Sequence, residues 1–248
     1  LGPGLANGLA NLHNAKKAHS GIVNIVGEHA IDHIKLNAPL TSDIEGIARP
    51  VSHWVKTSLS SKDIARDGAE AIAVAKVVPG QIATLILPGD TAWNEGANYD
   101  NENITININQ VSNQKIETSA KQLREAKKPM ILIGGSALEG DNFINIAKIA
   151  EKIGCPVMTD WFNARIDKGQ GRINAVRIPY VVEKAVNVLK EFDTILIIGA
   201  KKPVAFFAYP NKPGILTQEN TKFIELAELS DDISKVVSSL TDIFDANK

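Results

Sequence analysis

The stretch Ala126-Lys-Lys-Pro-Met-Ile-Leu-Ile-Gly-Gly135 decides the fold of the second half of the chain. Residues 129–133 are a short apolar run ended by two glycines, which is typical of a buried parallel strand. Around it we expect helices at residues 118–126, 141–153, 180–192 and 232–244, and strands at residues 156–159 and 194–198. Strands that alternate with helices in this way predict a parallel sheet covered on both faces.

The first half of the chain shows the same rhythm. The predicted elements are a helix at residues 5–17, a strand at 21–26, a helix from Ser60 or Ser61 to Val77, and a strand at 83–87. Pro3 and Gly4 mark the start of the first helix, and an apolar strand ended by Pro88-Gly89 suits parallel pairing. The fold class is therefore predicted as α/β, with two doubly wound parallel-sheet domains.

A polar, asparagine-rich segment separates the two halves and predicts a domain linker. The alternation of Ile104, Ile106 and Ile108 allows a short edge strand within it. The predicted organisation is a first domain at residues 1–95, a linker at 96–113, a Rossmann-like domain at 114–240, and the start of a further linker at 241–248. The chain begins with Leu1 inside an apparent element, so we expect it to be a piece of a longer protein.

Composition excludes several classes of function. The 248 residues include 27 Lys or Arg and 28 Asp or Glu without a basic stripe, so no nucleic-acid partner is expected. No apolar run approaches the roughly 18 residues that span a bilayer, so no membrane partner is expected either. The single Cys155 cannot form an internal disulfide and fits a reducing compartment, which predicts a cytoplasmic protein.

Isolated motifs carry little chemistry. Gly134-Gly-Ser136 between a strand and a helix could hold a phosphate, but it lacks the G-x-G-x-x-G spacing, and a tight turn explains it as well. Arg165, Arg172 and Arg177 could likewise bind a diphosphate or lie on an exposed loop. All five histidines fall in the first quarter of the chain, yet no H-E-x-x-H pattern accompanies them, so no metal site is predicted.

The order of several segments is more specific than any single motif. The segments are Gly2-Pro-Gly-Leu-Ala-Asn-Gly8, Asn37-Ala-Pro-Leu-Thr-Ser-Asp43, Pro88-Gly-Asp-Thr-Ala-Trp93, the stretch from Ala126 to Gly135, and Ala200-Lys-Lys-Pro-Val-Ala-Phe-Phe-Ala-Tyr-Pro210. In this order they resemble thiamine-diphosphate-dependent enzymes of the acetolactate synthase, pyruvate oxidase and benzoylformate decarboxylase group. The resemblance covers nearly the whole chain. It implies that residues 1–95 are the C-terminal part of the pyrimidine-binding domain and residues 114–240 the central domain.

The resemblance also implies a cofactor and partners. In that family, thiamine diphosphate lies between two chains, activated by a glutamate upstream of Leu1 and held with Mg²⁺ by a Gly-Asp-Gly motif in a domain beyond Lys248. The chain alone is therefore expected to be inactive, its catalytic residues are unknown, and its partners are a small 2-oxo acid and a second copy in a dimer or tetramer. The central domain binds FAD in acetolactate synthases and pyruvate oxidases, but no flavin contacts can be matched here.

The resemblance also implies site residues, which are assigned by their positions in the matching segments. The residues that match the segment beside the cofactor aminopyrimidine are Gly2, Pro3, Gly4 and Asn7. The same residues also suit a helix start at a dimer interface. The residues expected at the substrate pocket are His29, Pro39, Leu40 and Thr41, with His29 and His33 as proton carriers or as ordinary surface histidines.

The function that the resemblance implies is a fragment of a 2-oxo-acid carbon–carbon lyase or ligase. Acetolactate synthases carry Phe-Gln-Glu where this chain has Pro39-Leu40-Thr41, and Leu-Thr is closer to benzoylformate decarboxylases, which favours an apolar pocket. Two alternatives stay open. One is a non-catalytic nucleotide-binding (FAD or ADP) or scaffold module, and the other is a degenerate relative retained as a partner subunit.

Overall fold

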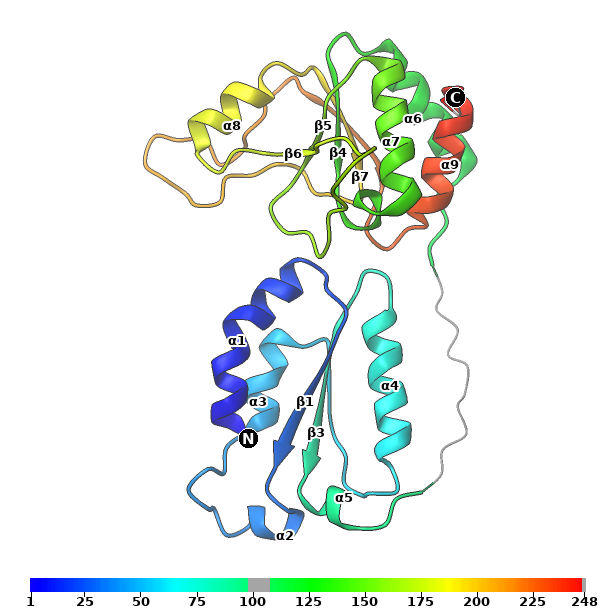
Figure 1. The fold of residues 1–248 in the computed structure, drawn as a ribbon. Coiled ribbons are helices and arrows are strands. Elements are labelled where there is room, and N and C mark those ends of the chain that lie inside the picture. The colour runs from blue at the N-terminus through cyan, green and yellow to red at the C-terminus, as the bar shows by residue number, and fades with distance from the viewer. Residues whose placement is uncertain (98–107, 247–248) are drawn as a thin grey trace. The chain divides into compact units, whose positions relative to one another are not determined.

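The computed structural model describes residues 1–97 and 108–246 and divides the chain into two compact units (Figure 1). The first unit is Leu1–Asn107 and the second is Ile108–Lys248. Each unit has its own parallel sheet and its own hydrophobic core. Most of the predicted linker, including the expected strand positions Ile104 and Ile106, lies outside the described residues.

The first unit contains a three-stranded parallel sheet in the order β1–β3–β2. Its strands are β1 (Ile22–Glu28), β2 (Trp54–Thr57) and β3 (Ile82–Pro88). All seven residues of β1 pair with β3, from Ile22 opposite Ile82 to Glu28 opposite Pro88. The apolar run of β3 follows from its central position, because a central parallel strand is covered on both faces.

Helices cover both faces of this sheet (Figure 1). On one face lie α1 (Gly2–Lys17) and α3 (Ile44–Ala48), which enclose a core of Leu5, Val26, Ile44, Ala48 and Ile86. The opposite face is covered by α4 (Ile64–Lys76). Short connections are α2 (Ile31–Ile34), the 3-10 turn Arg49–Val51 and α5 (Asp90–Trp93).

The second unit contains a five-stranded parallel sheet in the order β6–β5–β4–β7–β8. Its strands are β4 (Pro129–Ile133), β5 (Val157–Thr159), β6 (Val176–Arg177), β7 (Thr194–Ile198) and β8 (Lys222–Ala227). The chain runs outward from β4 to β6 and then returns to build β7 and β8 on the other side of β4. Such a reversal of strand order opens a crevice at the carboxyl ends of the two strands between which it occurs, here β4 and β7.

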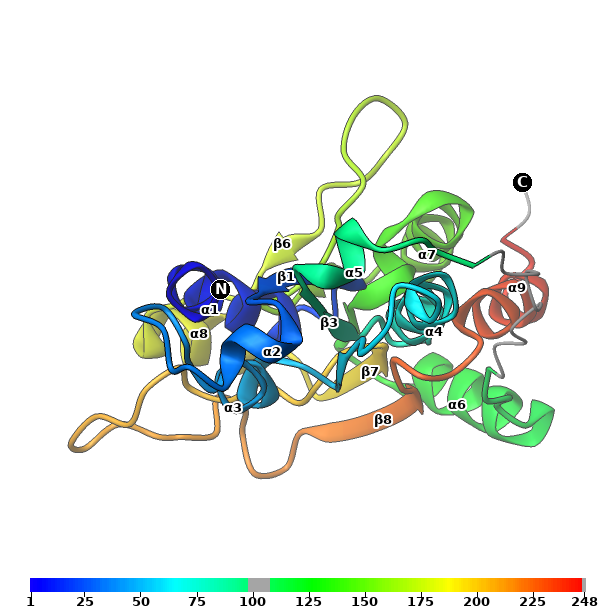
Figure 2. The same ribbon diagram turned by 90° about the horizontal axis from the view of Figure 1, so that it is seen from below.

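The helices of the second unit lie on both faces of its sheet. One face carries α6 (Asn113–Glu125), the 3-10 turn Gly135–Leu138, α7 (Gly140–Ile153) and α9 (Ile233–Ile243), and the other carries α8 (Val182–Leu189). Figure 2 shows α8 on the opposite side of the sheet from α6 and α9. Alternate residues of β4 enter the two cores: Ile131 and Ile133 pack with α7, and Met130 and Leu132 pack with α8. No described helix is long and apolar enough to cross a membrane.

The α/β class and the parallel sheets covered on both faces are confirmed. The strands predicted at residues 129–133 and 194–198 have those bounds. Three strands escaped prediction. β2 has four residues and β6 has two, and β8 carries Lys222 and Glu225 because it lies at the edge of the sheet, so none reads as an apolar run.

Several predicted boundaries differ from the structure, among them that of the helix expected at residues 118–126, which begins at Asn113. The helix expected to start at Ser60 or Ser61 begins at Ile64, and Asp63 occupies the N-cap position. The linker expected from residue 241 is part of the second unit, because α9 continues to Ile243 and both Phe244 and Ala246 are buried in the core. At the other boundary, Val111 is also buried in that core.

A buried carboxylate joins α4 to β2 in the first unit. The side chain of Asp67 is 2% exposed and lies 2.9 Å from Lys56 Nζ and 3.2 Å from Arg66 Nη2. Burial by itself raises the pKa of Asp67, but hydrogen bonds from Lys56 and Ser58 and the nearby positive charges outweigh burial and hold this pKa below its ordinary value. Asp67 is therefore ionised when the unit is folded at neutral pH.

Replacing Asp67 with Asn should lower the free energy of unfolding by about 2 kcal/mol at neutral pH, because Lys56 and Arg66 lose their buried partner. Since the folded-state pKa lies below the unfolded-state value, this difference is present above about pH 4 and is lost as the pH falls through the folded-state pKa. Urea unfolding at a series of pH values measures it. The control Asp63→Asn removes an exposed partner of Arg66 and should cost less than about 1 kcal/mol. Equal losses in both variants would contradict this assignment.

Candidate functional site

The carboxyl ends of β1 and β3 form one edge of the first unit. The backbone N–H of Gly89 donates to the carbonyl oxygen of Glu28 at 3.0 Å, and the backbone N–H of Ile31 donates to Asp90 Oδ1 at 3.1 Å. These two bonds tie the start of α2 to the start of α5. Ligands of parallel α/β sheets bind at this kind of edge, because loops from different strands converge there.

A hollow of about 620 Å³ lies at this edge. It is lined by Glu28, His29, Ala30, Asp32, His33, Leu36, Gly89 and Trp93. The His29 and His33 rings lie with their centroids 5.3 Å apart, with His29 just before α2 and His33 within it. His29 Nε2 is buried and has no hydrogen-bond partner among the described residues.

The other predicted pocket residues do not line this hollow. Pro39, Leu40 and Thr41 are on a turn closed by a 2.9 Å hydrogen bond from the N–H of Thr41 to the carbonyl oxygen of Ala38. None of the three lines the hollow that contains His29. Pro39 and Leu40 are exposed, and Thr41 Oγ1 is buried without a partner in the described part of the chain.

The turn contacts the start of α1 instead. A Cβ placed on Gly2 would lie 2.8 Å from Ser42 Cβ, so only glycine fits at position 2. The structure thus brings Gly2 next to the predicted pocket turn. Its small size is required by packing within the unit, which supports the structural explanation for this glycine.

Other residues in the first two turns of α1 are exposed. Pro3, Gly4 and Asn7 are exposed, and a Cβ on Gly4 or Gly8 would meet nothing within 4 Å. This bare backbone fits the approach of a flat ring, as the aminopyrimidine contact requires. Residues 1–97 and 108–246 contain no group of three or more His, Cys, Asp or Glu that could hold a metal ion. The described residues leave open space beside the backbone of Gly4 and Gly8.

The point between β4 and β7 where the strand order reverses is bordered by two glycines. The ideal Cβ of Gly134 would collide with the carbonyl oxygen of Gly199, and Gly199 itself has φ +65°. Close backbone contact at the ends of β4 and β7 therefore explains the glycines that follow both strands. Sequence analysis identified Gly134-Gly-Ser136 as a tight turn or a phosphate site, and this contact supports the turn.

Polar side chains follow β5 beside this crevice. Asn163 Nδ2 donates to Thr159 Oγ1 at 2.9 Å and to Asp160 Oδ1 at 3.1 Å. Burial raises the pKa of Asp160, and the Asn163 hydrogen bond and the charges of Lys201 and Arg177 only partly oppose this. Sequence reasoning did not single out Asp160 and Asn163 as site residues. Their position just after a buried strand was the available signal.

The three arginines, for which a diphosphate site and an exposed loop were both considered, do not converge on one point. Arg165 and Arg172 both pair with Asp167, at 2.9 and 3.6 Å, whereas the Arg177 guanidinium lies 5.9 Å from the Trp161 ring centroid. Asp167 also accepts a hydrogen bond from the N–H of Gly140 at 2.8 Å. Two of the three guanidinium groups therefore hold the 166–175 loop on α7.

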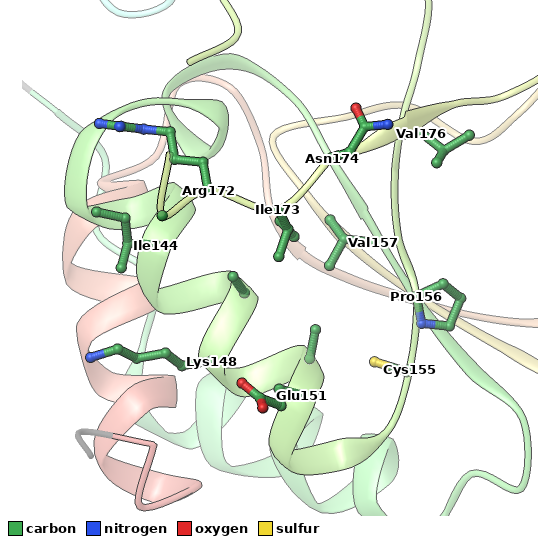
Figure 3. A pocket seen from close by; sticks show the side chains of 13 residues that line it. Ile144, Lys148, Glu151, Cys155, Pro156, Val157, Arg172, Ile173, Asn174 and Val176 are labelled. Atoms are coloured by element: carbon green, nitrogen blue, oxygen red, sulfur yellow. The ribbon is translucent and has the colours of Figure 1, made fainter. Parts of the chain in front are cut away.

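A second hollow, of about 680 Å³, lies between α7 and the start of β5 (Figure 3). Its floor is apolar, and Figure 3 shows the charged ends of Lys148 and Arg172 directed away from Val157. Burial raises the pKa of Cys155 in this hollow to about 11, so the thiol is protonated at neutral pH. The predicted inert, buried cysteine agrees with this environment, and no polar groups converge here to bind a charged ligand.

The comparison with known families decides the identity. Residues 116–246 match the family model described as "Thiamine pyrophosphate enzyme, central domain". This chain belongs to the thiamine pyrophosphate enzyme family. The match includes all the strands of the second unit, so the predicted resemblance is confirmed for that unit.

Members of the thiamine pyrophosphate enzyme family are similar to this chain over most of its length. A Mycobacterium tuberculosis protein with the provisional name acetolactate synthase large subunit IlvX is 37% identical over 230 residues, 92% of this chain and 44% of the relative. The acetolactate synthase of Mycobacterium leprae is 27% identical over 163 residues, 64% of this chain and 26% of the relative. The chain therefore spans less than half the length of these curated relatives.

Solved structures of the thiamine pyrophosphate enzyme family share the fold. The thiamine diphosphate-dependent 4-hydroxybenzoylformate decarboxylase of Rhodococcus jostii RHA1 matches with a TM-score of 0.76 and 19% identity, over 96% of this chain and 48% of that chain. The benzoylformate decarboxylase of Polynucleobacter necessarius matches with a TM-score of 0.76 and 20% identity, over 97% and 48%. At these identities the likeness establishes the α/β architecture alone.

The glycine contact at the crevice of this family member can be tested by Gly134→Ala. The added methyl group would push β4 and β7 apart at their carboxyl ends and lower the free energy of unfolding by about 2 kcal/mol. Thermal unfolding followed by circular dichroism measures the loss. Gly214→Ala is the matched control, because a Cβ at Gly214 meets nothing within 4 Å. A Gly134→Ala melting temperature equal to that of the control would disprove the contact.

Proposed function

We propose that this chain is part of a thiamine-diphosphate-dependent enzyme that makes or breaks a carbon–carbon bond next to the carbonyl of a 2-oxo acid. The supporting observation is the edge of the first unit, where the bare start of α1 packs against the turn that carries Leu40 and Thr41. A flat cofactor ring and an apolar substrate would be neighbours at such an edge. The match of the second unit to the thiamine pyrophosphate enzyme family also supports this proposal.

Each residue of this edge has a definable task. When bound, thiamine diphosphate would supply a thiazolium carbon that acts as an electron sink. Gly4 and Asn7 would let the aminopyrimidine ring lie against backbone, and Leu40 would exclude water from the substrate side. His29 Nε2, which is buried without a partner in the described residues, would donate or accept a proton.

The proposed substrate is a 2-oxo acid with an apolar side chain. The relatives named above are acetolactate synthases and benzoylformate decarboxylases. Pro39-Leu40-Thr41 offers no charged side chain. We expect the 248 residues by themselves to be catalytically inactive, because residues 1–97 and 108–246 contain no group of three or more His, Cys, Asp or Glu that could hold Mg²⁺.

A second candidate function rests on the crevice of the second unit. Asp160, Asn163 and Lys201 lie beside the backbone contact of Gly134 and Gly199, at the point where strand order reverses. Nucleotides bind at this point in many doubly wound sheets. A non-catalytic module that binds ADP or FAD would use this crevice without the edge of the first unit.

The variant Gly4→Leu tests the proposed function. The new side chain enters open space on an exposed helix, so folding should be unaffected, but it would occupy the ring position. In the native gene product, calorimetric titration with thiamine diphosphate and Mg²⁺ should show an affinity at least about 100-fold lower than that of the unmodified protein, because a ring cannot stack through a leucine.

The matched control is Ala10→Leu, which adds a similar apolar side chain to another exposed position of α1. It should bind the cofactor like the unmodified protein. Equal affinities of Gly4→Leu and Ala10→Leu would refute the ring position. Tight binding of ADP or FAD by a gene product that ignores thiamine diphosphate would favour the second candidate function.

A further inference from the structure

The ring of His53 attaches the start of β2 to β3 in the first unit. The backbone N–H of His53 donates to the carbonyl oxygen of Ile82 at 2.8 Å. In return, the backbone N–H of Ile82 donates to Nδ1 of the His53 ring at 2.9 Å. A side-chain nitrogen therefore acts as the acceptor at the point where the parallel pairing of β2 with β3 begins.

These two bonds matter because β2 is a short edge strand. The sheet order β1–β3–β2 gives β2 a single neighbour, and only the four residues Trp54–Thr57 pair with it. The far end of β2 is held by the N–H of Ser58, which donates to the carbonyl oxygen of Ile86 at 2.9 Å. The start of β2 is held by the two bonds above and by a 2.7 Å hydrogen bond between Ser52 Oγ and Thr84 Oγ1.

The bond from Ile82 requires a deprotonated Nδ1 on His53. A backbone N–H can only donate, so Nδ1 presents its lone pair and the ring proton lies on Nε2. An imidazolium ring carries protons on both nitrogens and cannot accept this bond. Ile82 is 0% exposed, so its N–H would be left without a partner inside the fold. His53 itself is exposed, so protons from solvent reach the ring.

A positive charge from α1 also disfavours the protonated ring. Lys16 Nζ donates to the carbonyl oxygen of Pro50 at 2.9 Å and to that of Ser52, the residue before His53, at 3.5 Å. Burial of the ring and then the charge of Lys16 lower the pKa of His53 below its ordinary value. Since the unfolded-state pKa of histidine is about 6.5, the stabilisation from this bond is complete above that pH and is lost as the pH falls toward the folded-state pKa.

The other titratable groups near the start of β2 do not offset the charge of Lys16. On the α4 side, Glu70 accepts hydrogen bonds from Trp54 Nε1 at 3.1 Å and from Lys56 Nζ at 2.8 Å. His19 lies on the turn after α1, where its carbonyl oxygen faces Gly80 before β3. The carboxylate of Glu70 is therefore engaged with other side chains of this edge.

We propose that His53 is an acid-sensitive latch: the neutral ring holds the start of β2 on β3, and protonation of the ring in mildly acidic solution releases it. The released segment includes Pro50 and Ser52, whose carbonyl oxygens Lys16 contacts. Opening the latch therefore also loosens the attachment of α1. The inference goes beyond the proposed function, because it requires neither cofactor nor catalysis.

Hydrogen–deuterium exchange of the native gene product at residue resolution tests the latch. After correction for the intrinsic pH dependence of exchange, the protection of the Ile82 N–H should fall at least about threefold between about pH 7.5 and about pH 5, because one neutral hydrogen bond is lost. The Ser58 N–H, at the far end of β2, is the internal reference and should keep its protection.

The variant His53→Asn separates the hydrogen bond from the titration. Oδ1 of asparagine occupies nearly the position of Nδ1 and accepts a hydrogen bond at every pH in this range, so the protection of Ile82 should not change with pH. His53→Leu offers no acceptor and should show at least about threefold lower protection already at the higher pH. The matched controls His13→Asn and His19→Asn remove two other histidines and should keep the loss seen in the unmodified protein.

Three outcomes would overturn the proposal. They are a protection of Ile82 that is independent of pH in the unmodified protein, an acid-induced loss in His53→Asn equal to that in His13→Asn, and an equal loss at Ile82 and Ser58, which indicates general acid unfolding. None of them depends on thiamine diphosphate binding, so they are distinct from a failure of the proposed function.

Discussion

The pairing of β4 with β7 is the contact on which the second unit depends. The two strands are parallel over five residue pairs, from Pro129 opposite Thr194 to Ile133 opposite Ile198. Both are central, so their alternate residues point into two separate cores, and every one of these positions except Pro129 is buried. Because both faces of β4 and β7 are buried, polar side chains are disfavoured at these positions. It also forces the chain to leave each strand through a glycine, because the backbones at Gly134 and Gly199 meet.

The functional edges follow from this architecture. Parallel strands deliver all their carboxyl ends to one side of a sheet, so side chains far apart in sequence converge there. In the first unit this places His29 and His33 beside Trp93, and in the second it places Asp160 and Asn163 beside Lys201. Trp161 after β5 and Phe206 after β7 meet in the same way, with ring centroids 6.0 Å apart. The second of these two units matches the thiamine pyrophosphate enzyme family.

The two units differ in how they use buried charge. The core of the second unit contains Phe143 and Phe244 among aliphatic side chains, whereas the first unit buries Asp67 between Lys56 and Arg66 to join α4 to the short edge strand β2. A three-stranded sheet with few buried apolar residues gains less from hydrophobic burial than a five-stranded one. The ion pairs therefore matter more for its geometry.

The sequence by itself determined the α/β class, most element positions and the family. Apolar runs such as residues 129–133 record burial on both faces, and the ordered segments around Gly2 and Pro88 carry the family resemblance. The sequence did not predict β8, because Lys222 and Glu225 interrupt the apolar run that identifies a buried strand. It also did not predict that Gly2 lies close to Ser42. Only the tertiary structure decided that Arg165 and Arg172 both form ion pairs with Asp167. It also decided that Leu40 does not line the hollow that contains His29. The physical reason is that periodicity reports which face of an element is buried, whereas convergence at a sheet edge depends on strand order and register.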